Sequence, residues 1–175
     1  MSEEALLLAT RDRIREVCGY SPAECDTDFD EFAPPDTGEV YVCVMPSEWT
    51  AGPYQDSGNV HDQTIGVRVA VVQRAASKPA DRFRNLFMTN LSNINKRCRE
   101  IVDAVDFSYE VTTLAAKYDE DSAQWHHPLQ WQGTAAPQTV AAEFFKAATY
   151  GGASHAGGLM RVISFGGARV TVTRT

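Results

Sequence analysis

The sequence predicts an α+β fold: a small, mostly antiparallel sheet with a long amphipathic helix and an N-terminal helix packed on it. Two apolar, β-branched runs at residues 40–45 and 65–72 predict strands, a long helical pattern follows them at 81–105, and a shorter one precedes them. At 175 residues, 43% of them hydrophobic, the chain is long enough for one core and short for two, so we expect one domain, 1–175. A mixed sheet is the alternative arrangement of the strands.

The first helix is expected between Glu4 and Cys18. Leu7, Ile14 and Cys18 share one helical face. Gly19 supplies a helix stop, because glycine readily adopts the left-handed conformation that ends helices. Residues 24–39 then carry seven carboxylates and no Lys or Arg, which indicates an acidic connector.

Two strands are expected next, joined as an antiparallel hairpin. Residues 40–45 read Val-Tyr-Val-Cys-Val-Met, which predicts a strand buried on both faces and ended by Pro46. Residues 65–72 alternate in a period of two and present one apolar face. Residues 46–63, between them, are rich in Gly, Pro and aromatic residues and are predicted to form an extended loop or arm, which at that length usually serves function or interaction.

The clearest helix pattern follows. Asp81 is a candidate N-cap, and apolar residues recur every three or four positions from Phe83 to Val105. This stripe is wide enough to cover one face of a sheet. Tyr109–Leu114, β-branched and aromatic, is predicted as a further strand.

Residues 117–175 are predicted to form a C-terminal extension with a short helix at Thr139–Ala148 and a terminal hairpin. The hairpin would join Leu159–Phe165 to Ala168–Thr173 through Gly166-Gly167, a dipeptide that favours tight turns. Residues 150–158, rich in Gly, Ala and Ser, are expected to be mobile.

Charge and composition exclude some functions. A net charge of −7 and a pI near 5.0 argue against a protein that wraps nucleic acid through its phosphates, which requires clustered cations. The start of the chain lacks the basic region of a signal peptide, and no apolar run is long enough to span a bilayer, so we expect a soluble protein made in a cytoplasm. The four cysteines lack paired spacing and are interpreted as buried free thiols.

No residue set predicts a catalytic or cofactor-binding site. Cys43 and His61 could in principle form a nucleophile and its base, but no motif around either residue brings them together. The glycine pairs lack the strand–loop–helix context and the Lys of a phosphate loop, and they are interpreted as turns.

No metal site is predicted either. Asp-x-Asp-x-Asp at residues 26–30 is similar to the start of a calcium loop, but Glu31 replaces the turn glycine and Thr37 the final glutamate. A solvated acidic loop is therefore the interpretation. His126-His127 lacks a suitably spaced third ligand.

Four aromatic residues in polar segments are candidates for a subunit or partner interface: Trp49, Tyr54, Trp125 and Trp131. Aromatic side chains are enriched where a partner buries a surface. The alternative is that they cap the edge of the domain's own core.

The order and length of these elements resemble those of the tail terminator proteins of long-tailed bacteriophages. The resemblance runs from the helix at Ala5–Cys18 through the strands at 40–44 and 65–72 to the long helix at 81–105 and a later strand, about residues 5–114, and it involves no short diagnostic motif. It implies a small α/β fold with helices on a mixed or antiparallel sheet, assembled as a hexameric ring. Residues 117–175 depart from a minimal terminator.

The resemblance also implies a function: a structural virion protein, not an enzyme, whose ring caps the tail tube and docks it to the head connector. Expected partners are copies of itself, the tube protein and the connector or neck proteins, with DNA passing through the lumen without specific binding and no cofactor. The location would be the virion tail or neck after assembly in the host cytoplasm. The alternatives are a head-completion or connector subunit and, from another class, a small hydrolase using Cys43 or Cys98 with a loop histidine.

Overall fold

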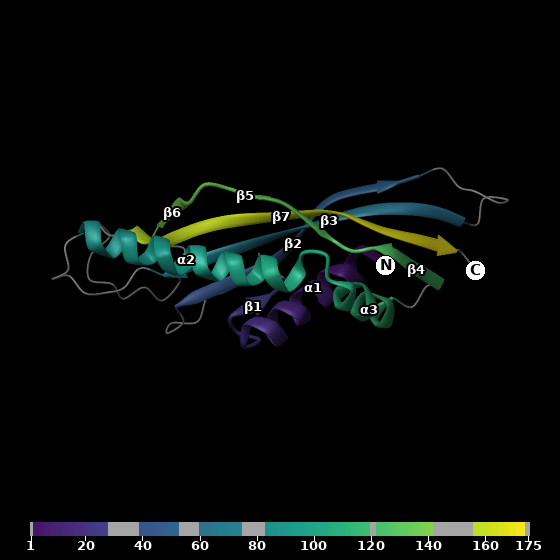
Figure 1. The fold of residues 1–175 in the computed structure, drawn as a ribbon, viewed down its shortest axis with the longest axis horizontal. Coiled ribbons are helices and arrows are strands. Elements are labelled where there is room, and N and C mark those ends of the chain that lie inside the picture. The colour runs from purple at the N-terminus through teal and green to yellow at the C-terminus, as the bar shows by residue number, and fades with distance from the viewer. Residues whose placement is uncertain are drawn as a thin grey trace.

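The structure, a computed structural model, describes residues 2–27, 39–52, 60–74, 83–119, 122–141 and 156–173. Three helices and a mixed sheet of seven strands make up this part of the chain, which confirms the predicted α+β class. The elements in chain order are α1 (Ser2–Cys18), β1 (Cys25–Asp26), β2 (Val40–Ala51), β3 (Val60–Arg74), α2 (Phe83–Val105), α3 (Tyr109–Tyr118), β4 (Ser122–His127), β5 (Gln130–Thr134), β6 (Gln138–Ala141) and β7 (Ala156–Thr173) (Figure 1).

The sheet is built around the long strand β7. Its order is β1-β2-β3-β7-β4, and β5 and β6 also pair with β7, so three short strands follow one another along the side of β7 opposite β3. Every pair is antiparallel except β1 with β2. At about 3.3 Å per residue the 18 residues of β7 span roughly 60 Å, which gives the molecule the elongated form seen in Figure 1.

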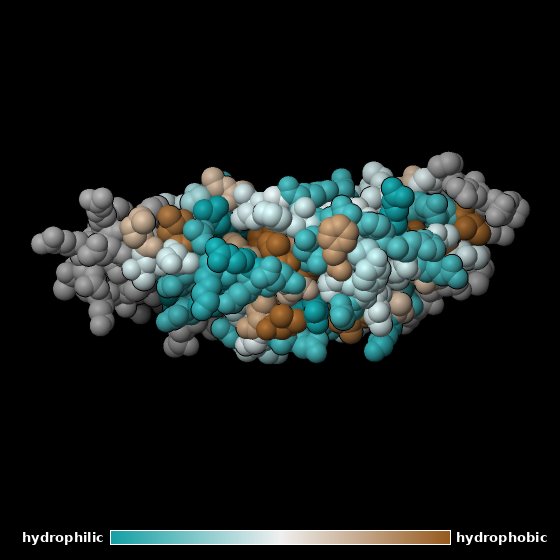
Figure 2. Space-filling model, in the orientation of Figure 1, coloured by the Kyte–Doolittle hydropathy of each residue, from teal (hydrophilic) through white to brown (hydrophobic). Residues whose placement is uncertain are grey.

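The core lies between one face of this sheet and the three helices. Alternate residues of β2 and β3, such as Val42 and Val69, are fully buried against this side because successive side chains of a strand point to opposite faces. From α2, Ile94, Cys98 and Ile101 meet them at helical spacing. Figure 2 shows the outward face of α2 as largely hydrophilic, as expected for a helix that buries one stripe only.

The N-terminal helix is tied to the rest of the fold by polar contacts. Ser2 Oγ donates to Asp119 Oδ2 at 2.6 Å, which joins the start of α1 to the end of α3. Arg13 Nε donates to the carbonyl of Ala104 on α2 at 3.1 Å.

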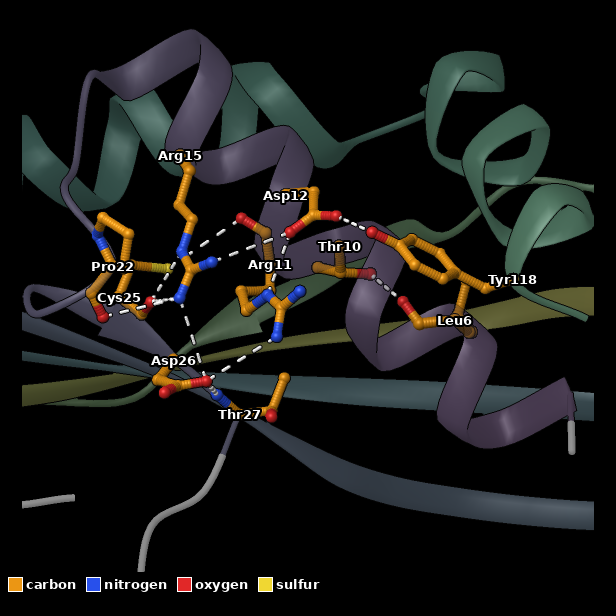
Figure 3. Close-up of polar contacts among 10 residues, drawn as sticks. All are labelled: Leu6, Thr10, Arg11, Asp12, Arg15, Pro22, Cys25, Asp26, Thr27 and Tyr118. Atoms are coloured by element: carbon orange, nitrogen blue, oxygen red, sulfur yellow. Dashed lines mark hydrogen bonds and ion pairs between the residues drawn. The ribbon is translucent and has the colours of Figure 1, made fainter. Parts of the chain in front are cut away.

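A cluster of charged residues anchors the short strand β1 (Figure 3). Arg15 donates through Nε and Nη2 to the carbonyl of Cys25, at 2.8 and 2.6 Å. The carboxylate of Asp26 lies within 4 Å of the guanidinium groups of both Arg11 and Arg15. Asp26, the first aspartate of the Asp-x-Asp-x-Asp pattern, therefore forms ion pairs with both arginines, while residues 28 and 30 lie outside the described residues.

Several predicted elements are confirmed. The first helix ends at Cys18, and Gly19 has a φ of 77° while its N–H bonds to the carbonyl of Arg15. β2 and β3 form the predicted antiparallel hairpin, and the long helix spans Phe83–Val105. Its predicted N-cap, Asp81, lies outside the described residues.

The prediction that Pro46 ends the first strand is wrong, and so is that of a loop over the whole of 46–63. β2 continues through Pro46 to Ala51 and β3 begins at Val60, so only residues 53–59 of that span lie outside the described residues. The register shifts between Pro46 and Trp49, a β-bulge of the kind that accommodates proline at a sheet edge.

The predicted strand at Tyr109–Leu114 is also wrong, because these residues belong to helix α3. Val111 and Ala115 are buried at a spacing of four and face the core, a helical periodicity that a six-residue window does not separate from a strand pattern.

The predicted C-terminal elements differ in the same way. Residues 138–141 form strand β6, so the predicted helix at Thr139–Ala148 does not begin there, and residues 142–150 lie outside the described residues. The predicted terminal hairpin is wrong, since β7 runs unbroken from Ala156 to Thr173. Gly166-Gly167 lies where the register with β3 shifts, and Gly167 has a φ of 76°, so the pair forms a bulge within one strand.

Candidate functional site

Trp49 lies near the end of β2, half exposed at 50%. Its indole N–H donates to Gln63 Oε1 at 3.0 Å, and Gln63 Nε2 lies 2.7 Å from His61 Nε2. Because an indole N–H can only donate, the amide oxygen of Gln63 faces Trp49, and its NH₂ group donates to His61. This chain of side chains across β2 and β3 holds the exposed indole in one orientation.

Trp125, on β4, is only partly exposed and packs against the core opposite Val170 of β7. Its indole N–H is buried and has no hydrogen-bond partner within the described part of the chain. Of the two interpretations weighed from sequence, capping of the domain's own core fits this residue.

Trp131, on β5, is exposed at 49% and lies beside the connection between α2 and α3. Its backbone N–H donates to Asp106 Oδ1 at 2.7 Å, and its indole N–H donates to Thr134 Oγ1 at 3.2 Å. The fourth candidate, Tyr54, lies outside the described residues. The structure thus separates the three described tryptophans into one that caps the core and two exposed residues, one at the end of β2 and one beside the helices.

Sequence reasoning missed the residues that surround Trp131. Phe107 and Tyr109, in the α2–α3 connection and at the start of α3, are 54% and 64% exposed. Phe107 is the one residue other than glycine with a positive φ, 52°, among the residues that the structure describes. Its ring lies edge-on to His127, with centroids 6.2 Å apart. We call Asp106–Tyr109 together with His127–Trp131 the aromatic corner.

No sequence signal marked Asp106–Tyr109, the half of the aromatic corner that joins the helices. A turn between two helices that needs a left-handed residue usually carries Gly or Asn, and a phenylalanine there gives no warning. The wrong prediction of a strand at Tyr109–Leu114 also concealed that a helix begins beside it.

The Cys43–His61 pair considered from sequence is not brought together. Cys43 pairs with Ala70 in the hairpin, and His61 lies nine residues from Ala70 along β3, roughly 30 Å at about 3.3 Å per residue. Cys98, the other nucleophile considered, is buried in the core, and this burial raises the pKa of its thiol to about 11. A thiolate at Cys98 is therefore disfavoured near neutral pH.

Across the described ranges, no three His, Cys, Asp or Glu side chains gather into a set that could hold a metal ion. His126 and His127, adjacent on β4, bond instead to Thr171 Oγ1 and to the carbonyl of Pro128. None of the helices α1, α2 and α3 has the length and apolar character needed to cross a membrane.

The chain matches no family model and no curated protein.

Proposed function

We propose that this chain is a structural virion protein, a tail terminator-like subunit that forms a ring on the phage tail tube and docks it to the head connector. The observation that carries the proposal is the exposed end of β2. Residues Pro46–Ala51 are all exposed although they belong to a strand paired with β3, and they present Trp49 on a fixed backbone.

The outer side of this strand end is available for contact. β1 pairs with β2 only at Val42 and Cys43, so Pro46–Ala51 have β3 on one side and no strand on the other in the part of the chain that the structure describes. We call this stretch the β2 edge. Figure 1 shows the ends of β2 and β3 reaching past α3. An exposed strand edge with a half-exposed tryptophan is typical of a surface that a neighbouring subunit buries.

The form of the sheet favours a ring over a symmetric dimer. Its two edges differ: one is the open β2 edge, and the other is the row of short strands β4, β5 and β6 along β7. A contact between unlike surfaces of identical subunits is heterologous, and such contacts form rings when the rotation closes. Pro46 and the bulge beside it limit the registers in which another strand can pair with this edge. This favours contact with one specific neighbouring subunit over open-ended aggregation of strands.

The charge of the chain supports the same proposal. A net charge of −7 would let DNA pass through a ring by repulsion without specific binding. Partners would be further copies of the chain, the tail tube protein and the head–tail connector or neck proteins, and the location would be the virion after assembly in the host cytoplasm.

The test compares two apolar residues of nearly equal exposure, Trp49 on the β2 edge and Val17 on helix α1. Trp49→Ser should lower the fraction of ring in sedimentation velocity at least tenfold, because an aromatic anchor at an interface typically contributes 2 kcal/mol or more. Val17→Ser, on helix α1 and on neither edge of the sheet, is the matched control and should leave the ring unchanged. Rings that tolerate Trp49→Ser would remove the β2 edge from the interface, and a twelvefold ring would favour a connector subunit.

A further inference from the structure

The aromatic corner exposes more apolar surface than a monomer needs to. Phe107, Tyr109 and Trp131, each at least 49% exposed, come from two segments that the fold brings together. Large apolar side chains gathered on one surface mark interaction sites, whereas scattered ones need no explanation.

The backbone of the aromatic corner is fixed before any partner arrives. Phe107 N–H donates to the carbonyl of Leu129 at 2.9 Å, and the carboxylate of Asp106 holds the N–H of Trp131. Phe107 keeps a left-handed φ of 52°, a conformation that costs free energy for any residue with a Cβ. The fold therefore maintains a strained residue whose ring is mostly exposed.

Two carboxylates, those of Asp106 and Glu110, lie beside these rings, and Arg169 is the strand partner of His127 at the edge of the corner. Asp106 uses Oδ1 for Trp131, and Oδ2 has no hydrogen-bond partner among the described residues. Hydrogen bonds from its own backbone and from Ser108 lower the pKa of Glu110, so this carboxylate is ionised at neutral pH. The charge of Arg13 also lowers the pKa of Glu110, and Arg13 Nε is already bonded to a backbone carbonyl on α2.

We infer that the aromatic corner binds an arginine side chain of a partner protein, flanked there by apolar residues. A guanidinium group is planar, stacks on aromatic rings and donates to carboxylates at the same time, which matches rings beside the free oxygen of Asp106. The indole N–H of Trp131 is engaged by Thr134, so this ring offers apolar contact and no donor. This inference concerns the corner and not the β2 edge, and its test reads the binding of a small compound instead of the assembly of rings.

The test is a titration of the full chain with N-acetyl-arginine methylamide, followed through the indole N–H signals of the three tryptophans by nuclear magnetic resonance. The signal of Trp131 should shift saturably in the millimolar range, while that of Trp49 stays in place as an internal control. The neutral citrulline analogue, equal in shape, should shift Trp131 at least fivefold less. Equal shifts from both compounds, or no saturable shift from the arginine compound, would overturn the inference.

Two variants separate charge from structure. Asp106→Asn keeps an oxygen for the N–H of Trp131 but removes the charge, and it should weaken binding of the arginine compound about tenfold, as expected for loss of a charge-assisted contact. Glu16→Gln removes an exposed carboxylate from α1 and should leave binding unchanged. Equal weakening by both variants would show a general effect of net charge and contradict a site at the corner.

The last comparison distinguishes a protein segment from the free amino acid. A blocked Leu-Arg-Leu tripeptide should bind more tightly than free arginine, because its apolar side chains can pack on the exposed rings. Tighter binding of free arginine would contradict a protein partner. Both arms follow the signal of Trp131 with the signal of Trp49 on the β2 edge as internal control, so binding at the corner is read separately from ring formation.

Discussion

Replacing Phe107 by glycine and by alanine should reverse the usual order of these two residues. Both variants lose the same ring, and both keep the N–H that bonds to Leu129. At a φ of 52° alanine retains the left-handed penalty of about 1–2 kcal/mol, while glycine avoids it and instead costs about 0.5–1 kcal/mol through the entropy of the unfolded chain. The glycine variant should therefore be more stable by about 0.5–1 kcal/mol.

Urea unfolding followed by circular dichroism measures this difference. For a chain of this size, the expected difference in stability between the two variants corresponds to a difference of about 1–4 °C in Tm. Ala116→Gly, at an exposed position of helix α3, is the matched control and should lower stability by about 1 kcal/mol, the ordinary cost of glycine in a helix. An alanine variant at position 107 as stable as the glycine variant, or more so, would refute the claim that the corner stores backbone strain.

Three further predictions concern the sheet, β1 and the thiols. Gly158→Ala should destabilise the fold by about 1–3 kcal/mol, because the new Cβ would meet a backbone carbonyl of β3. Gly167→Ala would meet no atom and should cost only the left-handed penalty of about 1–2 kcal/mol, and urea unfolding of the two variants measures both costs. Arg15→Lys should cost about 1–2 kcal/mol and speed amide exchange around Cys25, because lysine cannot reproduce the forked donation; unchanged exchange would contradict this role. Burial raises the pKa of the Cys25 thiol to about 12 and that of Cys98 to about 11, whereas both thiols ionise near 9.0 in the unfolded chain. Above pH 9.0 the unfolded state therefore loses protons that the folded state keeps, and the urea midpoint should fall as the pH rises towards 11. A constant midpoint would count against the burial of these thiols.

Long periodic segments of the sequence predicted the fold well. The stripe along α2 repeats over 23 residues, and the alternation of β3 is sustained, so each pattern distinguishes helix from strand by itself. Short segments predicted the fold less well. Tyr109–Leu114 is rich in strand formers, yet its packing against α1 makes it helical, because tertiary contacts outweigh weak local preferences.

Glycine and proline, which usually mark turns and strand ends, also gave wrong predictions inside the sheet. Gly166-Gly167 would turn a free ribbon, but β7 pairs with β3 on one side and with β5 on the other at this point, so the glycines are absorbed as a bulge. Pro46 lies at the outer edge of β2, where a missing N–H interrupts no ladder. Among the candidate interface residues, Trp49 and Trp131 were identified from sequence as aromatic residues in polar segments. Phe107 was not, because its position in the corner depends on a left-handed backbone conformation that phenylalanine does not predict.

The most direct test of the central proposal is the mass of the purified protein by native mass spectrometry over a range of concentrations, with class averages from electron microscopy of the same samples. The proposal predicts a closed ring of identical subunits, a hexamer, which grows with concentration at the expense of the monomer. A chain that stays monomeric at every concentration, or that forms only a twofold dimer, would contradict a ring-forming virion subunit.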